Sequence, residues 1–180
     1  MKLFRTGRTG GRRRLLFVLT AVVSLLGSTA LAIGVANASV DGYFEIRNDT
    51  SNKCVDVKDK STAPGALTQQ FDCHNVNEQL WLPVDVGNGY FMLQSRNNSQ
   101  MCLDVKFGST LPETPVDQES CSIGGPRMQW RWGGSNPPHL VLQSGLGNVC
   151  LALQGFSRRN GWPIVIRDCA STSGQEWHFS

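Results

Sequence analysis

The chain has 180 residues, with 17 Lys and Arg against 14 Asp and Glu, a formal charge of +3. Residues 1–38 hold six of the 17 bases and no acid, so the remainder carries 11 bases and 14 acids, a charge of −3. An acidic remainder without clusters of basic and aromatic residues argues against a nucleic-acid partner. The remaining length, roughly 140 residues, is enough for one domain with a single core.

Residues 1–38 predict an export signal. Basic residues precede an apolar run over about 15–35, and Ala-Asn-Ala at 36–38 is a small-x-small cleavage site, so Ser39 is the expected mature N-terminus. The alternative is an uncleaved anchor, because the run is long enough to cross a bilayer. Gly and Ser residues at 27, 28 and 34 interrupt the run and favour cleavage. The arginines at 12–14 leave a twin-arginine route open beside the general one. We therefore expect a secreted, extracellular protein with no membrane contact after cleavage.

The rest of the chain repeats one unit three times. Three stretches each place two cysteines 19 positions apart, and the stretches begin 48 residues apart. A tryptophan follows each pair at nearly constant distance, with glutamine two positions before it in the first and third copies. A fixed period of this kind indicates an internal repeat. The residues are Cys54 and Cys73, Cys102 and Cys121, Cys150 and Cys169, then Trp81, Trp130 and Trp177, with Gln79 and Gln175.

Six cysteines allow fifteen disulfide connectivities, and two of these schemes respect the repeat. Each pair can join within its own repeat, or each first cysteine can join the second cysteine of the next repeat. The local scheme closes loops of about 20 residues and forms more readily. We expect no metal or cofactor, because zinc cysteines usually come as C-x-x-C pairs. The three histidines, His74, His139 and His178, share no repeat position either.

Apolar residues recur with a period of two within a repeat, for example at 43–46, 54–57 and 79–82. This alternation predicts short strands, and turn-forming residues lie between them. About four strands in each of three repeats give twelve strands. The chain has too few residues for a propeller, and its repeats are too irregular for a solenoid. The sequence therefore predicts an all-β, closed threefold barrel with a hairpin cap, with repeats at about 43–86, 87–135 and 136–180. We assign the three repeated tryptophans to its core.

Two motifs carry a resemblance to a known family. Cys-Val-Asp-Val at 54–57 and Cys-Leu-Asp-Val at 102–105 are each followed by a second cysteine and a Gln-x-Trp or its remnant. This pattern, from about residue 43 to 179, resembles the ricin B-type lectin family. The resemblance implies a β-trefoil over residues 39–180, built of three pseudo-symmetric four-strand repeats with one disulfide each, which acts as a carbohydrate-binding module.

The resemblance also implies a sugar pocket in each repeat. An Asp two residues after the first cysteine takes two hydroxyls, and an aromatic two before the second cysteine stacks on the ring. In the first repeat these positions, with the polar residues that complete the pocket, hold Asp56, Gln69, Phe71, Glu78 and Gln79. Glu78 departs from the more usual Asn. Independently of the family, alternation predicts that Asp56 points out of the core, since its two valine neighbours face inward.

The other two repeats depart further from the pattern. The second keeps Asp104 but has Glu119 at the stacking position, Asp117 at the polar position and Arg127-Met128 in place of Asn-Gln. Three clustered carboxylates without an aromatic make a poor site for a neutral sugar. The third has lost the site, with Ala152, Val165 and Arg167 at these positions.

We expect a non-catalytic lectin module, a monomer that binds a neutral sugar or polysaccharide of galactose, xylose or arabinose type mainly through its first repeat. The sequence holds neither Gly-x-Ser-x-Gly nor His-Glu-x-x-His, and every cysteine is assigned to a pair. Two alternatives stay open. The trefoil could contact proteins, as secreted protease inhibitors do, through a loop such as 106–115. Within the first repeat, Asp56 could cap a turn and Phe71 could be a core residue.

Overall fold

The structure is a computed structural model that describes residues 42–136, 139–170, 172 and 174–180, so the expected export signal and cleavage site lie outside it. The described part of the chain forms twelve strands, and short 3-10 helices lie in some of the connections between them. No helix within it is long and apolar enough to cross a membrane. The strands are β1 (Phe44–Asn48), β2 (Cys54–Val57), β3 (Ala66–Phe71), β4 (Leu80–Gly87), β5 (Tyr90–Ser95), β6 (Met101–Val105), β7 (Val116–Ser120), β8 (Trp130–Asn136), β9 (His139–Ser144), β10 (Val149–Leu153), β11 (Trp162–Asp168) and β12 (Glu176–Phe179).

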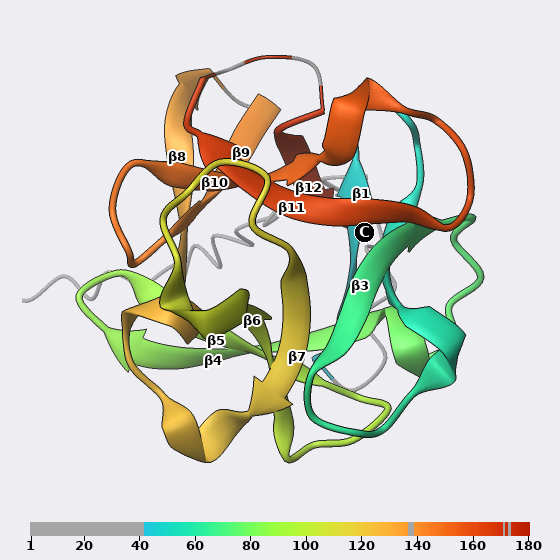
Figure 1. The fold of residues 1–180 in the computed structure, drawn as a ribbon, viewed down its shortest axis with the longest axis vertical. Coiled ribbons are helices and arrows are strands. Elements are labelled where there is room, and N and C mark those ends of the chain that lie inside the picture. Colours follow the sequence, from blue (N-terminus) through green and yellow to red (C-terminus); the bar gives the residue numbers. More distant parts are fainter. Residues whose placement is uncertain (1–41, 137–138, 171, 173) are drawn as a thin grey trace, which may run out of the picture. The chain divides into compact units, whose positions relative to one another are not determined.

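Six of the strands close into a barrel (Figure 1). Around the ring β1 pairs with β4, β4 with β5, β5 with β8, β8 with β9, β9 with β12, and β12 with β1, all antiparallel. Closure leaves no free strand edge in this ring. The alternating apolar pattern fits this arrangement, because one face of each barrel strand is turned to the interior.

The other six strands form three hairpins, β2–β3, β6–β7 and β10–β11. The hairpins join one another where β3 pairs with β7, where β11 pairs with β3, and through a bridge between Pro115 and Val165. A six-stranded barrel with three linked hairpins is the β-trefoil. The predicted all-β threefold fold is confirmed, and each group of four consecutive strands contributes one third of it.

Each hairpin turns through a similar short 3-10 helix, namely η1 (Lys58–Lys60), η3 (Lys106–Gly108) and η6 (Gln154–Phe156). The middle residue of each has a positive φ, at 57° for Asp59, 58° for Phe107 and 57° for Gly155. Glycine adopts this conformation freely, whereas other residues adopt it only where the surrounding structure holds them. The same turn therefore recurs although the three side chains differ.

The three repeated tryptophans are fully buried in the shared core. In each third, the indole Nε1 donates to the carbonyl of the residue that follows the first cysteine. The three bonds are Trp81 to Val55 at 3.2 Å, Trp130 to Leu103 at 3.1 Å and Trp177 to Leu151 at 3.0 Å. Each tryptophan thus ties a barrel strand to the hairpin of its own repeat.

The disulfides follow the local scheme, with Cα atoms 5.0–5.2 Å apart: Cys54–Cys73, Cys102–Cys121 and Cys150–Cys169. One bridge therefore lies within each repeat, and the scheme that joins neighbouring repeats is not the one formed. Each bridge links the first hairpin strand to the chain just beyond the second one.

Candidate functional site

A pocket of about 330 Å³ lies in the first repeat, at the open side of the β2–β3 hairpin. Its walls come from the end of β2, the η1 turn, β3 and the η2 turn (Asn77–Gln79). All five positions predicted for the first-repeat sugar site are among the lining residues. The full set is Asp56, Asp59, Lys60, Gln69, Phe71, His74, Val76, Glu78 and Gln79.

Asp56 lies in this pocket because β2 alternates. Val55 and Val57 are fully buried in the core, so Asp56 between them faces the opposite side of the hairpin. Asp56 is nevertheless only 6% exposed, and two glutamine amides bond its carboxylate. Gln69, its register partner on β3, donates from Nε2 to Oδ1 at 2.8 Å, and Gln79 donates from Nε2 to Oδ2 at 3.0 Å. Each carboxylate oxygen keeps a further lone pair for an incoming hydroxyl.

Burial raises the pKa of Asp56 above its ordinary 3.8, and the hydrogen bonds from Gln69 and Gln79 oppose that rise. The charge of Glu78 raises the pKa further and that of Lys60 lowers it. Asp56 is therefore protonated at a higher pH than an exposed aspartate would be. The side chain accepts hydroxyl protons as a carboxylate only above that raised pKa.

Gln79 has a second, structural role. Its Nε2 also donates to the carbonyl of Asp72 at 2.9 Å, and its Oε1 accepts from the backbone N–H of His74 at 2.8 Å. Gln175 makes the equivalent backbone bonds in the third repeat, with Asp168 and Ala170. In the first and third repeats the Gln of Gln-x-Trp thus holds the residues on either side of the second cysteine, and Gln79 additionally orients the carboxylate of Asp56.

Phe71 ends β3 and supplies an apolar wall of the pocket. It is half-buried and lies outside the buried core, so the alternative in which it is a core residue does not describe its position. Its ring centroid is 6.3 Å from that of His74, with the planes tilted by 54°. An aromatic wall beside a preset carboxylate is a general arrangement for a ligand with one apolar face and several hydroxyls.

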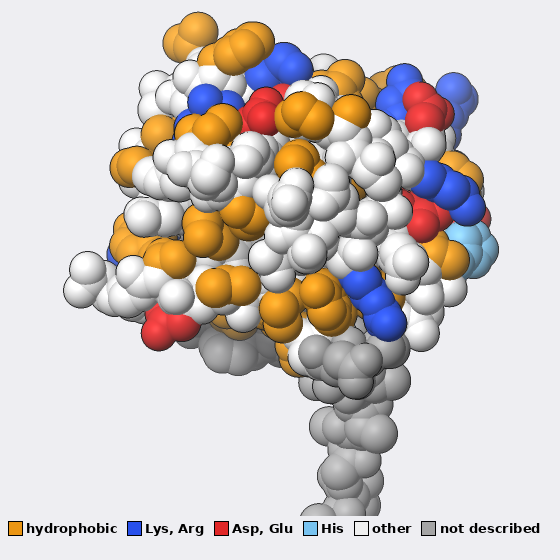
Figure 2. All heavy atoms as spheres, turned by 90° about the horizontal axis from the view of Figure 1, so that it is seen from below, with side chains coloured by type: hydrophobic (Ala, Val, Ile, Leu, Met, Phe, Trp, Pro, Cys, Tyr) orange, Lys and Arg blue, Asp and Glu red, His pale blue; other side chains and the backbone are white. Residues whose placement is uncertain are grey.

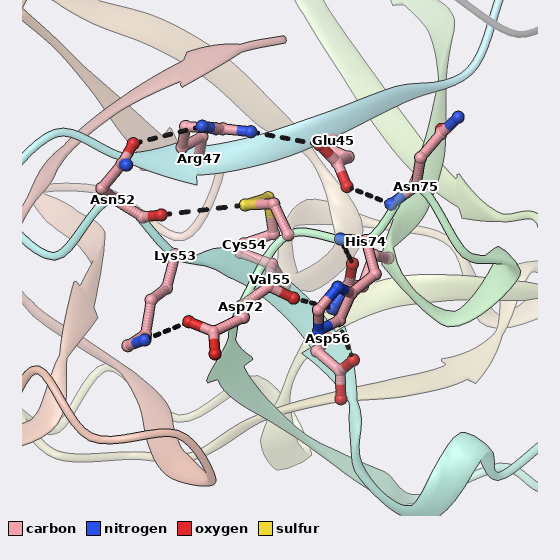
Figure 3. The surroundings of a disulfide bond; sticks show 12 residues. Glu45, Arg47, Asn52, Lys53, Cys54, Val55, Asp56, Asp72, His74 and Asn75 are labelled. Atoms are coloured by element: carbon pink, nitrogen blue, oxygen red, sulfur yellow. Dashed lines mark hydrogen bonds and ion pairs between the residues drawn. A yellow bond between two sulfur atoms is a disulfide. The ribbon is translucent and has the colours of Figure 1, made fainter.

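Figure 3 shows the surroundings of the Cys54–Cys73 disulfide, which holds the chain just after Phe71. This bridge joins the start of β2 to the segment between Phe71 and His74. Lys53 forms an ion pair with Asp72 on one side of the bridge, and Glu45 Oε1 accepts from the backbone N–H of Asn75 at 2.7 Å on the other. In the described part of the chain, Glu45 and these two cysteines are the group close enough to hold a metal, but both sulfurs are committed to the disulfide.

Four lining residues were not predicted from the sequence: Asp59, Lys60, His74 and Val76. Asp59 and Lys60 belong to the η1 turn, and Lys60 Nζ lies 3.1 Å from Glu78 Oε1. Turn residues carry no periodicity that would place their side chains. The one available signal was their position directly after the strand that carries Asp56.

The second repeat uses its acids differently. Asp104 is fully buried, and Arg127 donates to both of its oxygens, from Nε to Oδ1 at 2.6 Å and from Nη2 to Oδ2. Lys106 Nζ lies 3.1 Å from Asp117 Oδ2. The predicted cluster of three carboxylates, with Glu119 as the third, is therefore compensated by two cations of the same repeat. Arg127 occupies the oxygens with which Asp104 would hold a sugar.

The third repeat offers no comparable acceptor at the corresponding hairpin positions. Ala152 and Val165 form a register pair and are each 1% exposed, and Arg167 forms an ion pair with Glu113.

On the face shown in Figure 2, acidic and basic side chains lie beside one another rather than in separate patches.

Comparison with known proteins supports the β-trefoil fold and the likeness to lectins. The family model described as "Ricin-type beta-trefoil lectin domain-like" matches residues 33–119. The chain is similar to the designed threefold symmetric protein ThreeFoil, with 29% identity, a TM-score of 0.74, and coverage of 77% of this chain and 98% of that one. It is also similar to an exo-beta-1,3-galactanase from Clostridium thermocellum, at 24% identity and a TM-score of 0.72, with 78% of this chain covering 30% of the galactanase.

A third similar structure is the Macrolepiota procera ricin B-like lectin in complex with lactose, at 16% identity and a TM-score of 0.65 over 78% of this chain and 96% of the lectin. At 16% identity, the structural similarity shows the shared fold alone. The family match over residues 33–119 confirms the resemblance indicated by the cysteine and Gln-x-Trp pattern. The similar structures show the shared β-trefoil fold.

Proposed function

We propose that this protein is a secreted, non-catalytic carbohydrate-binding module that binds a neutral sugar unit of a glycan mainly through its first repeat. The observation that carries the proposal is the convergence of Asp56, Gln69, Phe71 and Gln79 on one pocket, with the carboxylate held by both amides. Export rests on the signal expected in residues 1–38 and on three disulfides, which persist in oxidising compartments.

Each wall has a defined task in this proposal. Asp56 accepts from two adjacent hydroxyls, and charge-assisted hydrogen bonds of this kind contribute about 1.5–3 kcal/mol each. Phe71 packs against the C–H face of the ring, so the hydroxyl edge is left to Asp56 and Gln69. One shallow site of this kind corresponds to a dissociation constant of roughly 0.1–1 mM. Galactose-, xylose- and arabinose-type units are the proposed class, and two similar lectins were solved with lactose and GalNAc.

The test is retention of the mature protein on immobilised polysaccharides, followed by a glycan array to identify the sugar. Asp56→Asn removes the charge but keeps the shape, and we expect it to abolish retention. Phe71→Ala should weaken binding about tenfold, because the stacking surface is lost. The matched control is Asp85→Asn, an exposed acid on β4 outside the pocket, which should bind as the wild type does. Unchanged retention of a folded Asp56→Asn protein would contradict the proposal.

A second candidate function is protein contact through the turn and loop at 106–115. Phe107 is 82% exposed and Leu111 is 71% exposed, so this turn and loop offer two large apolar side chains to a protein partner. A protein that used this loop would ignore sugars and lose its partner on a Phe107→Ser, Leu111→Ser substitution. The same double variant should retain full sugar binding if the first-repeat proposal is right.

A further inference from the structure

We infer that the first-repeat pocket prefers a sugar with a free, protonated amine, that is a hexosamine without its acetyl group, over the matching neutral sugar. This inference deepens the proposed function, since it requires that the pocket bind a sugar. It concerns Glu78, which lines the pocket at a position where the family more usually has Asn.

The pocket walls carry an excess of negative charge. Three carboxylates line it, on Asp56, Asp59 and Glu78, whereas Lys60 is the one lysine or arginine among the lining residues. With His74 neutral the walls hold a formal charge of −2. A concave site lined by one sign of charge attracts the opposite sign and repels its own. Uronic and sialic acids are therefore disfavoured, and a cationic sugar is favoured.

The position of the amine is indicated by Lys60. Its Nζ lies 3.1 Å from Glu78 Oε1, so the protein already binds an ammonium group of its own inside the pocket. The side chain of Glu78 is 9% exposed, and Lys60 is its charged partner among the described residues. A buried carboxylate favours a cationic partner, because removing its charge from water is costly unless it is paired. The amine of a bound hexosamine can take the place of the lysine.

Displacing Lys60 costs little, because its own side chain is 77% exposed and an exposed lysine is well solvated without a partner. The pocket also stays formed when the side chain leaves. Asn97 Nδ2 donates to the carbonyls of Lys60 at 3.0 Å and Ser61 at 2.9 Å, and this clamp from the neighbouring third holds the η1 turn. Lys60 keeps a φ of 54° there, a conformation that needs such support.

The experiment is a titration of the mature protein with matched sugars, measured by calorimetry or NMR. The sugars are glucose, glucosamine and N-acetylglucosamine, and galactose, galactosamine and N-acetylgalactosamine. For the epimer that binds, we expect the free amine to bind about tenfold more tightly than both the hydroxyl and the N-acetyl form, as a charge-assisted bond allows. The preference should shrink at high salt and disappear when the sugar amine is deprotonated.

Two variants assign the effect. Glu78→Gln should reduce the ratio of amine to hydroxyl affinity to about one, and Lys60→Ala should raise it about two- to threefold by removing the competitor. The matched controls are Glu119→Gln in the second repeat and Lys58→Ala, on the same turn but outside the pocket, and both should leave the ratio unchanged.

The inference is wrong if the amine form binds no more tightly than the hydroxyl form, or if the preference survives in Glu78→Gln. Neutral sugars would still bind in both cases, so the proposed function would stand. If a folded protein binds none of these sugars and no glycan on the array, the proposed function fails as well.

Discussion

Asp117 is a buried acid in an unusual setting. It is 2% exposed, and its Oδ1 has no hydrogen-bond partner among the described residues. Burial raises its pKa, the bond from Lys106 lowers it and the charge of Asp104 raises it again, to about 7. Arg127 and Glu119 are the other charged groups facing this pair, and Arg127 is bonded to Asp104. The second repeat therefore contains a carboxyl that titrates near neutrality.

This pKa predicts how stability depends on pH. The unfolded side chain titrates near 3.8 and the folded one near 7, so the folded state binds the extra proton between these values. The proton that Asp117 holds in the folded state therefore stabilises the fold. This stabilisation is fully present below about pH 4 and is lost as the pH rises to 7. Asp117→Asn mimics the protonated form. Its unfolding free energy relative to the wild type should therefore rise by up to a few kcal/mol between pH 4 and 7.5.

Denaturant unfolding at several pH values measures this difference, and the exposed Asp85→Asn variant serves as control. A difference between wild type and Asp117→Asn that stays constant with pH would show that the carboxyl titrates normally.

The three hairpins show how one element supports different chemistry. In each, the second residue after the first cysteine pairs in register with the same position of the returning strand. The pairs are Asp56 with Gln69, Asp104 with Asp117 and Ala152 with Val165. The first pair lines a pocket, the second belongs to an ion-pair cluster and the third is apolar. The backbone frame is common, and the side chains at two register positions separate the roles.

The disulfides allow stability and binding to be separated. Each bridge joins cysteines 19 positions apart. Two double variants remove one bridge each, Cys54→Ala with Cys73→Ala and Cys102→Ala with Cys121→Ala. Each should lower the unfolding free energy by about 3 kcal/mol. Only the first pair should also weaken sugar binding, because that bridge holds the segment between Phe71 and His74. Unfolding curves and sugar titrations of both double variants test this. Equal loss of affinity in both would indicate a general loosening of the fold.

Among the described residues, we find the expected binding set in the first repeat, whereas the corresponding positions of the second and third repeats hold an ion-pair cluster and apolar side chains. We therefore expect a binding stoichiometry of one sugar per chain and no cross-linking of multivalent glycans, since avidity requires several working sites. Calorimetry gives the stoichiometry, and agglutination or light scattering with a branched polysaccharide tests cross-linking. A stoichiometry of two or more, or precipitation of the polysaccharide by a monomeric protein, would contradict this expectation.

The repeat, the strands and a closed threefold barrel could be predicted from the residues, which also favoured the local disulfide scheme over the alternative. The β-trefoil itself was what the family resemblance implied. The 19-residue spacing recurs without change, and local loops close most readily, so the pattern leaves few arrangements that treat the three copies alike. Alternation of apolar residues similarly predicted which face of β2 carries Asp56, because side chains on a strand can point to only two sides.

The charged contacts were beyond this kind of inference. Three contacts join separate segments of the chain. Arg127 binds the carboxylate of Asp104, Lys60 pairs with Glu78, and Asn97 bonds the η1 turn that carries Lys60. Spacing along the chain constrains such contacts weakly, because long side chains on turns have no period and many rotamers. Regular, short-range physics decides the frame of this protein, whereas the polarity of each pocket depends on side chains that only the folded chain brings together.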